Sequence, residues 1–218
     1  MKKIYVVGGN GFAKECYQQI LFQSYQEPEI KFAGFIGHNG YKVDFKSLNE
    51  YFVCDLSEFE FGDDDYAVIG AGMPDLRKKI YYDLKQKKNV KFYTVAYFPY
   101  CYISPLVEIG EGNIFMSPCC PAPHVKIGNG NVFNGDIVVG HDVEIGDFNF
   151  FGGKTQLLGG VKIGNSNQIG VASVFLPYSK IGDNNKIAPI SAVYKGCKNN
   201  CIMAGNPALK VGDIENEV

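Results

Sequence analysis

The 218-residue chain has few histidines, no tryptophan and no long apolar segment. A transmembrane helix needs about 20 consecutive, mostly apolar residues, and no stretch of this sequence approaches that length. The opening Met1–Gly9 lacks the extended apolar segment and the small-residue cleavage site of a secretory signal. We therefore expect no membrane span, no membrane partner and no secretion.

The chain also lacks an excess of charge and a disulfide pattern. Its 21 Lys and Arg residues are nearly balanced by 23 Asp and Glu residues, for a net charge of −2, so no nucleic-acid partner is expected. Seven cysteines, an odd number scattered from Cys16 to Cys201, favour a reducing, cytoplasmic location. Cys197 and Cys201 have no second pair at metal-site spacing. We predict that they are packing residues and that the protein has no metal site.

Residues 1–100 alternate strand-like and helix-like segments. β-branched and aromatic runs predict strands at residues 3–9, 30–37, 66–72 and 90–98. Apolar residues at helical spacing predict helices at 12–23 and 74–88. This alternation predicts a small Rossmann-like, parallel α/β domain at residues 1–100.

Residues 101–218 follow a different pattern, with a period of six. Sixteen consecutive hexads from Ile103 onward begin with Ile, Phe, Val, Leu or, once, Pro121. Hexapeptide repeats of this kind are typical of β-helices. We therefore predict a β-helix domain at 101–218, with its first end covered by the α/β domain and its last end capped by residues 199–210.

A second period of 18 lies within the hexads. Five isoleucines, each followed by Gly and, four positions after the Ile, by Asn, are spaced by 18 residues: Ile109, Ile127, Ile145, Ile163 and Ile181. Three hexads per coil predict three short faces. We expect the isoleucines and a parallel phenylalanine ladder inside, with Gly and Asn (Asn113, Asn131, Asn149, Asn167, Asn185) at corners where a positive φ is needed.

The hexads, together with "MAGNPA" at residues 203–208, resemble the hexapeptide-repeat acyltransferase superfamily. The resemblance implies a left-handed parallel β-helix, a homotrimer with active sites between subunits, and acetyl-CoA in a groove between neighbouring helices. Residues 5–15, 72–84 and 134–148 further resemble one branch of it. That branch contains the sialic-acid O-acetyltransferase-like proteins and the bacterial nucleotide-amino-sugar N-acetyltransferases.

The segment "VVGHDVEIGD" at residues 138–147 resembles part of that branch's active-site coil. The resemblance implies that His141 is a general base, that Asp142 makes it more basic, and that Asn134 is an active-site residue. An amine or hydroxyl that attacks a thioester must lose a proton, and histidine can accept it near neutral pH. One coil beyond His141, Gly159 has no side chain, so we expect room there for a ligand.

The second histidine of the repeat, His124, is predicted to be structural. With His141 it makes only two histidines in the hexads, whereas the zinc site of a γ-class carbonic anhydrase needs three. This alternative is therefore set aside.

The glycine turn at residues 8–11 follows a strand and opens a helix, which suits a phosphate held by backbone N–H groups. The resemblance implies a nucleotide-sugar site at Gly8, Asn10, Gly11, Phe12, Gly37 and His38. We expect the acetyl-CoA groove to run along columns of small residues close to the His141 column. One such column, spaced by 18 residues, is Gly153, Val171 and Pro189. The residues assigned to that groove are Phe150, Gly159, Gly170, Val171 and Pro189.

Three positions depart from the family, which often has histidine where this chain has Phe12, Phe98 and Phe150. The base is retained while binding positions differ. The leading hypothesis is an acetyl-CoA-dependent N-acetyltransferase acting on the 4-amino group of a nucleotide-linked amino-deoxy sugar. A sialic-acid-like O-acetyltransferase is the alternative within the enzyme class. A non-catalytic, trimeric nucleotide-sugar-binding protein is the alternative outside it.

Overall fold

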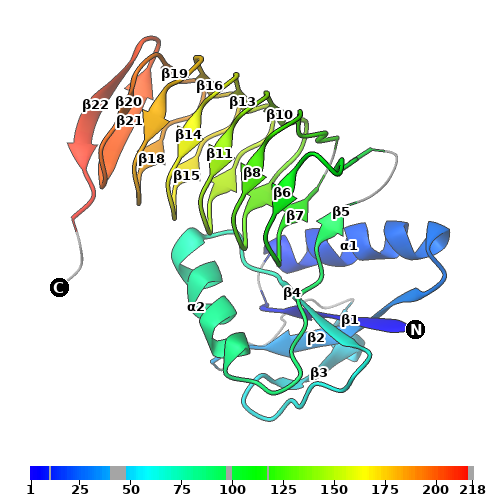
Figure 1. The fold of residues 1–218 in the computed structure, drawn as a ribbon. Helices are drawn as coiled ribbons and strands as arrows, with labels where there is room; N and C mark the ends of the chain where they lie inside the picture. The colour runs from blue at the N-terminus through cyan, green and yellow to red at the C-terminus, as the bar shows by residue number, and fades with distance from the viewer. Residues whose placement is uncertain (10, 40–47, 97–99, 117, 216–218) are drawn as a thin grey trace.

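The protein folds into an α/β region and a long β-helix (Figure 1). The structure, a computed structural model, describes residues 1–9, 11–39, 48–96, 100–116 and 118–215. Asn10 and Phe98, which the sequence analysis singled out, lie outside these ranges.

The α/β region is a four-stranded parallel sheet in the order β3-β2-β1-β4. Its elements are β1 (Lys2–Val7), α1 (Gly11–Gln26), β2 (Ile30–Gly37), the 3₁₀ helix η1 (Asn49–Tyr51), β3 (Phe52–Asp55), β4 (Asp65–Ile69) and α2 (Pro74–Lys85). Successive residues of a strand point to opposite faces. Ile4 and Val6 accordingly pack with α1, whereas Val7 packs with α2.

The predicted strands at 3–9, 30–37 and 66–72 are confirmed, but two features of the region differ. The sequence analysis missed β3. Residues 90–96, the described part of the strand predicted at 90–98, do not form a strand of this sheet, and β5 (Val95–Ala96) pairs with a strand of the β-helix instead. Near Phe92 the chain makes one isolated bridge to Ala67 and then leaves the α/β sheet.

The β-helix is built from three sheets, one for each face of the coil, whose strands are parallel and two residues long except for the two longer, antiparallel strands at the C-terminal end. One face holds β10 (Val138–Val139), β13 (Gln156–Leu157), β16 (Val174–Phe175) and β19 (Ala192–Val193). The second holds β6 (Glu108–Ile109), β8 (Lys126–Ile127), β11 (Glu144–Ile145), β14 (Lys162–Ile163), β17 (Lys180–Ile181) and β20 (Gly196–Cys197). The third holds β5, β7 (Ile114–Phe115), β9 (Val132–Phe133), β12 (Phe150–Phe151), β15 (Gln168–Ile169), β18 (Lys186–Ile187), β21 (Cys201–Gly205) and β22 (Ala208–Asp213).

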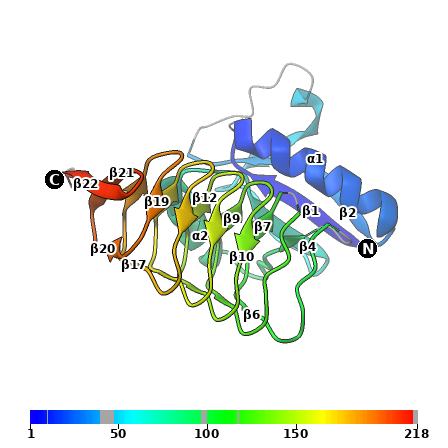
Figure 2. The same cartoon turned by 90° about the horizontal axis from the view of Figure 1, so that it is seen from above.

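The 18-residue period is confirmed by the strand register, because Ile145 pairs with Ile163 and Phe151 with Ile169. The stacked coils are seen from above in Figure 2. The first residue of each hexad points inward. Phe115, Phe133 and Phe151 stack with ring centroids 4.6 and 5.0 Å apart and nearly parallel planes. The expected isoleucine and phenylalanine interior is therefore present.

The expected role of the asparagines at the corners is wrong. The five are buried inside the coil and none has a positive φ. In each of the four that follow Asn113, the backbone N–H and the side-chain amide donate to Oδ1 of the preceding member, as when Asn149 donates both to Asn131 Oδ1 at 2.9 and 3.0 Å. Asn149 also donates to the carbonyl of Gly164 at 2.8 Å. These residues form an internal hydrogen-bonded ladder, because polar side chains survive burial only when they have partners.

Positive φ angles recur instead at three other columns, one at each corner. The columns are Gly112–Gly130–Phe148–Ser166–Asn184, His124–Asp142–Gly160–Tyr178 and Asp136–Lys154–Ala172–Ile190. The glycines in second hexad positions are required for a different reason, the lack of space for a side chain. A Cβ on Gly146 would lie 2.7 Å from the carbonyl oxygen of Gly164 in the next coil. They are glycines because successive coils approach closely there.

The α/β region packs against the side of the first coils, not over their end. Val95, Ile114 and Val132 on the outer face of the third sheet join the core beneath α1. Helix α2 lies along the Gly112–Gly130–Phe148 corner, where Tyr81 meets Phe148 with ring centroids 5.1 Å apart. The predicted covering of an end is thus replaced by packing along a flank (Figure 1).

One fully buried side chain, Arg77 of α2, crosses this junction. Its guanidinium donates to the carbonyls of Ile69 at 2.6 Å and Ala71 at 3.0 Å in the α/β region. It also donates to the carbonyls of Gly112 at 2.9 Å and Gly130 in the β-helix. Burial lowers the pKa of Arg77 to about 10.

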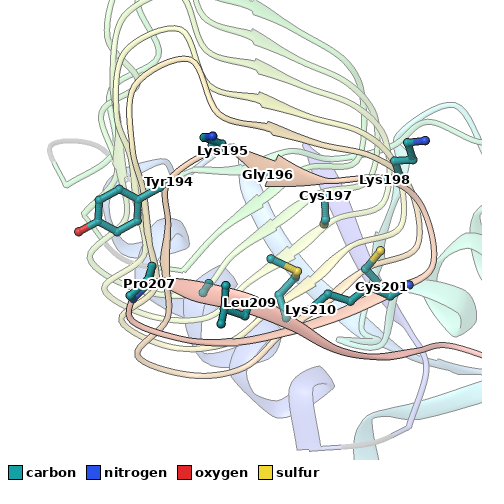
Figure 3. Close-up of a pocket in the computed structure, with 11 residues that line it drawn as sticks. Tyr194, Lys195, Gly196, Cys197, Lys198, Cys201, Pro207, Leu209 and Lys210 are labelled. Carbon is teal, nitrogen blue, oxygen red and sulfur yellow. The ribbon is translucent and has the colours of Figure 1, made fainter.

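The last coil ends in the antiparallel hairpin β21–β22, which breaks the hexad as predicted for a cap. Ala208 packs against the end of the core, but a cavity of about 540 Å³ remains (Figure 3). Cys197, Cys201 and three lysines are among its lining residues, and burial raises the pKa of the Cys197 thiol to about 12. Neither described helix is both long and apolar enough to cross a bilayer.

Candidate active site

His141 lies at the corner between β10 and β11, next to Asp142. Its Nδ1 is 2.7 Å from Asp142 Oδ2, and both side chains are more than half exposed. With Nδ1–H donated to the carboxylate, the neutral ring carries its lone pair on Nε2. Among the described residues, Nε2 has no hydrogen-bond partner. The pair therefore has the arrangement of a base that can take a proton from a bound group.

The ring of His141 lies against Gly159 in the next coil. A Cβ on Gly159 would be 2.6 Å from Nε2 and 2.7 Å from Cε1. The predicted position of Gly159 one coil beyond His141 is confirmed by a hydrogen bond, since the N–H of Gly160 donates to the carbonyl of His141 at 2.9 Å. The space over Gly159, expected to hold a ligand, instead seats the imidazole.

His124, in the coil before Asp142, is an exposed corner residue with a φ of 63°. Its backbone N–H donates to the carbonyl of Leu106 at 3.0 Å. The described contacts join Asp142 to His141, not to His124.

The glycine turn has the geometry expected between β1 and α1. Gly8 has a φ of 124°, and a Cβ there would lie 3.2 Å from the carbonyl oxygen of Gly70. A Cβ on Gly11, the first residue of α1, would meet no atom within 4 Å. The N-terminus of α1 therefore opens onto free space, where backbone N–H groups can face an anion.

Two other residues assigned to the substrate lie away from this space. His38 is buried and its Nε2 is 2.7 Å from Asp83 Oδ2 of α2. Gly37 ends β2 and accepts a hydrogen bond from the N–H of Leu56 at 2.8 Å. Both positions lie in the framework of the α/β region, and neither lines the opening above Gly11.

Two adjoining grooves collect most of the other predicted residues. The first has a volume of about 380 Å³ and is lined by Gly11, Phe12, Glu15, Gly72, Met73, Asn134, Phe150 and Gln168. The second, also about 380 Å³, runs along the third sheet and contains Gly170, Val171 and Pro189. Phe150 and Gln168 line both grooves and connect them. This part of the sequence-based assignments thus lies along one continuous surface.

Phe12 and Phe150, two of the departures from the family, are in contact. Their ring centroids are 6.2 Å apart at an angle of 70°, an edge-to-face arrangement. A Cβ on Gly72 would lie in van der Waals contact with both side chains, 3.4 Å from Phe150 and 3.7 Å from Phe12. In the sequence these are two separate departures. Their contact depends on the packing of the α/β region against β12, which the sequence does not show.

His141 lies at a different corner from both grooves. Asn134 follows β9, whereas His141 follows β10 on the next face of the coil. His141 does not line either groove in the described structure. Within one chain, then, the base and the grooves point in different directions.

No metal-ligand cluster accompanies these residues. In the described ranges, no group of three or more His, Cys, Asp or Glu side chains is arranged to hold a metal ion.

No family model matches the chain, and neither does any curated protein. Solved structures are similar over nearly its whole length. The acetyltransferase domain of PglB from Neisseria gonorrhoeae is 17% identical, covers 97% of this chain and 100% of that one, and has a TM-score of 0.84. WeeI from Acinetobacter baumannii is 24% identical, with 97% and 100% coverage and a TM-score of 0.81.

A third similar structure is a variant of perosamine N-acetyltransferase from Caulobacter crescentus, in complex with CoA and GDP-perosamine. It is 21% identical, covers 98% of each chain and has a TM-score of 0.81. At these identities the likeness establishes the fold. The likeness extends over the α/β region as well as the β-helix, so the predicted order of the two folds is confirmed.

Proposed function

We propose that the protein is an acetyl-CoA-dependent N-acetyltransferase that acts on the 4-amino group of a nucleotide-linked amino-deoxy sugar. The observation that carries the proposal is the His141–Asp142 pair at 2.7 Å, in an exposed imidazole whose Nε2 side lies against Gly159 and has no hydrogen-bond partner among the described residues. Similarity in fold to a protein described with CoA and GDP-perosamine supports the substrate class.

In the proposed reaction the acceptor amine attacks the thioester carbonyl of acetyl-CoA. As the C–N bond forms, the amine loses a proton to Nε2 of His141, and Asp142 stabilises the resulting imidazolium. The intermediate then collapses, the C–S bond breaks, and the CoA thiolate leaves and takes up the proton that His141 had accepted, which regenerates the base. General base catalysis of this kind contributes about 10²–10⁴-fold to the rate.

The groove along the third sheet is the proposed donor site. Gly170, Val171 and Pro189 present backbone and small side chains there, as an extended pantetheine arm requires. Because this groove and His141 lie on different faces of one chain, the proposal includes a homotrimer in which the base of one subunit meets the groove of its neighbour.

The proposed acceptor site is the opening above Gly11, where the N-terminus of α1 can hold a phosphate. Asn134 and Phe12 line it. His38 would not touch the acceptor and would support the site only indirectly, through its contact with Asp83 of α2. The Phe12–Phe150 pair distinguishes this site from one with histidines, so we expect the acceptor to differ from the family's usual ones.

The test is a thiol-release assay with acetyl-CoA and a panel of UDP-, dTDP- and GDP-linked 4-amino sugars, with sialic acid and serine for comparison. We expect release with an amino sugar and a loss of about 10²–10⁴-fold in His141→Ala. Gly159→Ala should also reduce turnover, because its Cβ would displace the imidazole. His124→Ala is the matched control and should keep wild-type turnover.

Release with sialic acid alone would replace the proposal with O-acetylation. No release with any acceptor, while a nucleotide sugar still binds, would favour the non-catalytic binding protein. Full turnover in His141→Ala would show that another group is the base.

A further inference from the structure

The same packing arrangement of an aromatic ring over a glycine occurs at two corners of the coil. At each of them the aromatic residue has a positive φ and lies over a glycine one coil earlier. A Cβ on Gly130 would be 2.7 Å from Phe148 Cδ1, and a Cβ on Gly160 would be 2.5 Å from Tyr178 Cδ1. Phe148 and Tyr178 have φ angles of 58° and 63°. In both cases glycine makes room for the ring.

The two rings differ in what covers them. Phe148 is 3% exposed because Tyr81 and Tyr82 of α2 pack on it. Tyr178 is 72% exposed, and it belongs to no buried core cluster of the described residues. Tyr178 therefore has one side of its ring against Gly160, and no other side chain of the buried clusters covers the rest of it.

Tyr178 stands beside the candidate base. Its backbone N–H donates to the carbonyl of Gly159 at 3.1 Å, which fixes it one coil beyond the glycine that seats His141. The imidazole covers Gly159 and the phenol ring covers Gly160. Because consecutive Cα atoms are about 3.8 Å apart, the two rings occupy neighbouring positions on one Gly–Gly step.

We propose that Tyr178 is a positioning residue for the acceptor, with its exposed ring packed against the sugar. The inference rests on the proposed function. An aromatic face packs well on the C–H face of a sugar ring and attracts a neighbouring ammonium group. A sugar held there presents its amine at the height of His141 Nε2. The feature selects an acceptor with a flat, apolar sugar face.

The experiment compares Tyr178→Ala and Tyr178→Phe with wild type, using the acceptor that supports turnover. Tyr178→Ala should raise the acceptor KM about tenfold, the size of one aromatic contact, while the acetyl-CoA KM stays within about twofold. Tyr178→Phe should restore the wild-type KM, because the ring is retained. Tyr25→Ala, which removes an 82% exposed tyrosine from α1, is the control and should change neither constant.

The mass of each variant is measured in solution in parallel. An unchanged acceptor KM in Tyr178→Ala, a rise confined to acetyl-CoA, or an equal loss in Tyr178→Phe would each overturn the inference. A changed oligomeric mass in Tyr178→Ala would overturn it in favour of a subunit contact. If wild-type protein acetylates nothing, the proposed function fails first and takes this inference with it.

Discussion

The two regions of the molecule are stabilised in different ways. In the β-helix many residues stack on a residue of the same type 18 positions away, as Phe133 does on Phe115 and Phe151 on Phe133. In the α/β region the residues that pack together are of different types, and a single side chain can make several different contacts. Repeat architectures distribute stability over many similar interfaces. The irreplaceable residues are therefore expected at the junction of the two regions, not within the coils.

Arg77→Met should produce the largest loss of stability. The substitution removes a fully buried guanidinium that donates to four carbonyls in both regions. Leaving several buried acceptors without partners should lower the free energy of unfolding by about 3 kcal/mol or more. Denaturant unfolding measures the effect, with Lys79→Met on the exposed side of α2 as the control. A loss below about 1 kcal/mol would show that the regions do not depend on this contact.

Asn149→Ala should have an intermediate effect. Asn149 is in the middle of the inner ladder, and the substitution leaves the Oδ1 of Asn131 and the carbonyl of Gly164 short of a donor. We expect a loss of about 1–3 kcal/mol in the free energy of unfolding.

Asn165→Ala is its matched control, because Asn165 is an exposed asparagine of the next coil that donates to Asp183 at 3.0 Å. Its loss should be smaller, since water can replace the missing partner. Equal losses in the two variants would mean that burial of the inner ladder contributes nothing extra.

Glu111→Gln should have the smallest effect and depend on pH. Glu111 accepts from Tyr81 at 2.6 Å and pairs with Lys85 at 2.5 Å, both on α2. Burial acts to raise the pKa of Glu111, but the hydrogen bonds from Lys85 and Tyr81 and the charge of Lys85 hold that pKa below its ordinary 4.5.

A carboxyl whose pKa is lowered by folding stabilises the protein above its unfolded pKa and loses that contribution as the pH falls through the folded value. The pair is partly exposed, so the difference in unfolding free energy between wild type and Glu111→Gln should be below about 1 kcal/mol at pH 7. It should shrink as the pH falls below 4.5. A difference that grows on acidification would contradict the assignment.

The sequence predicted more of the coil than of the site. Hexad starts such as Phe151 and Ile163 occupy the predicted interior positions, because each is repeated at a constant spacing. The buried role of Asn149 was missed, since a sequence period shows that residues stack but not which way their side chains face. The contact of Phe12 with Phe150 was missed because the two residues are far apart in the chain and belong to different regions.

The sequence by itself determined the β-helix register, the three-sheet coil and the neighbouring places of His141 and Asp142, because these depend on short, repeated spacings. Only the tertiary structure decided that Arg77 joins the regions, that Gly159 seats the imidazole, and that Tyr178 remains uncovered beside it. Such contacts depend on how unlike surfaces dock and on the directions of individual side chains. A periodic pattern specifies neither of these.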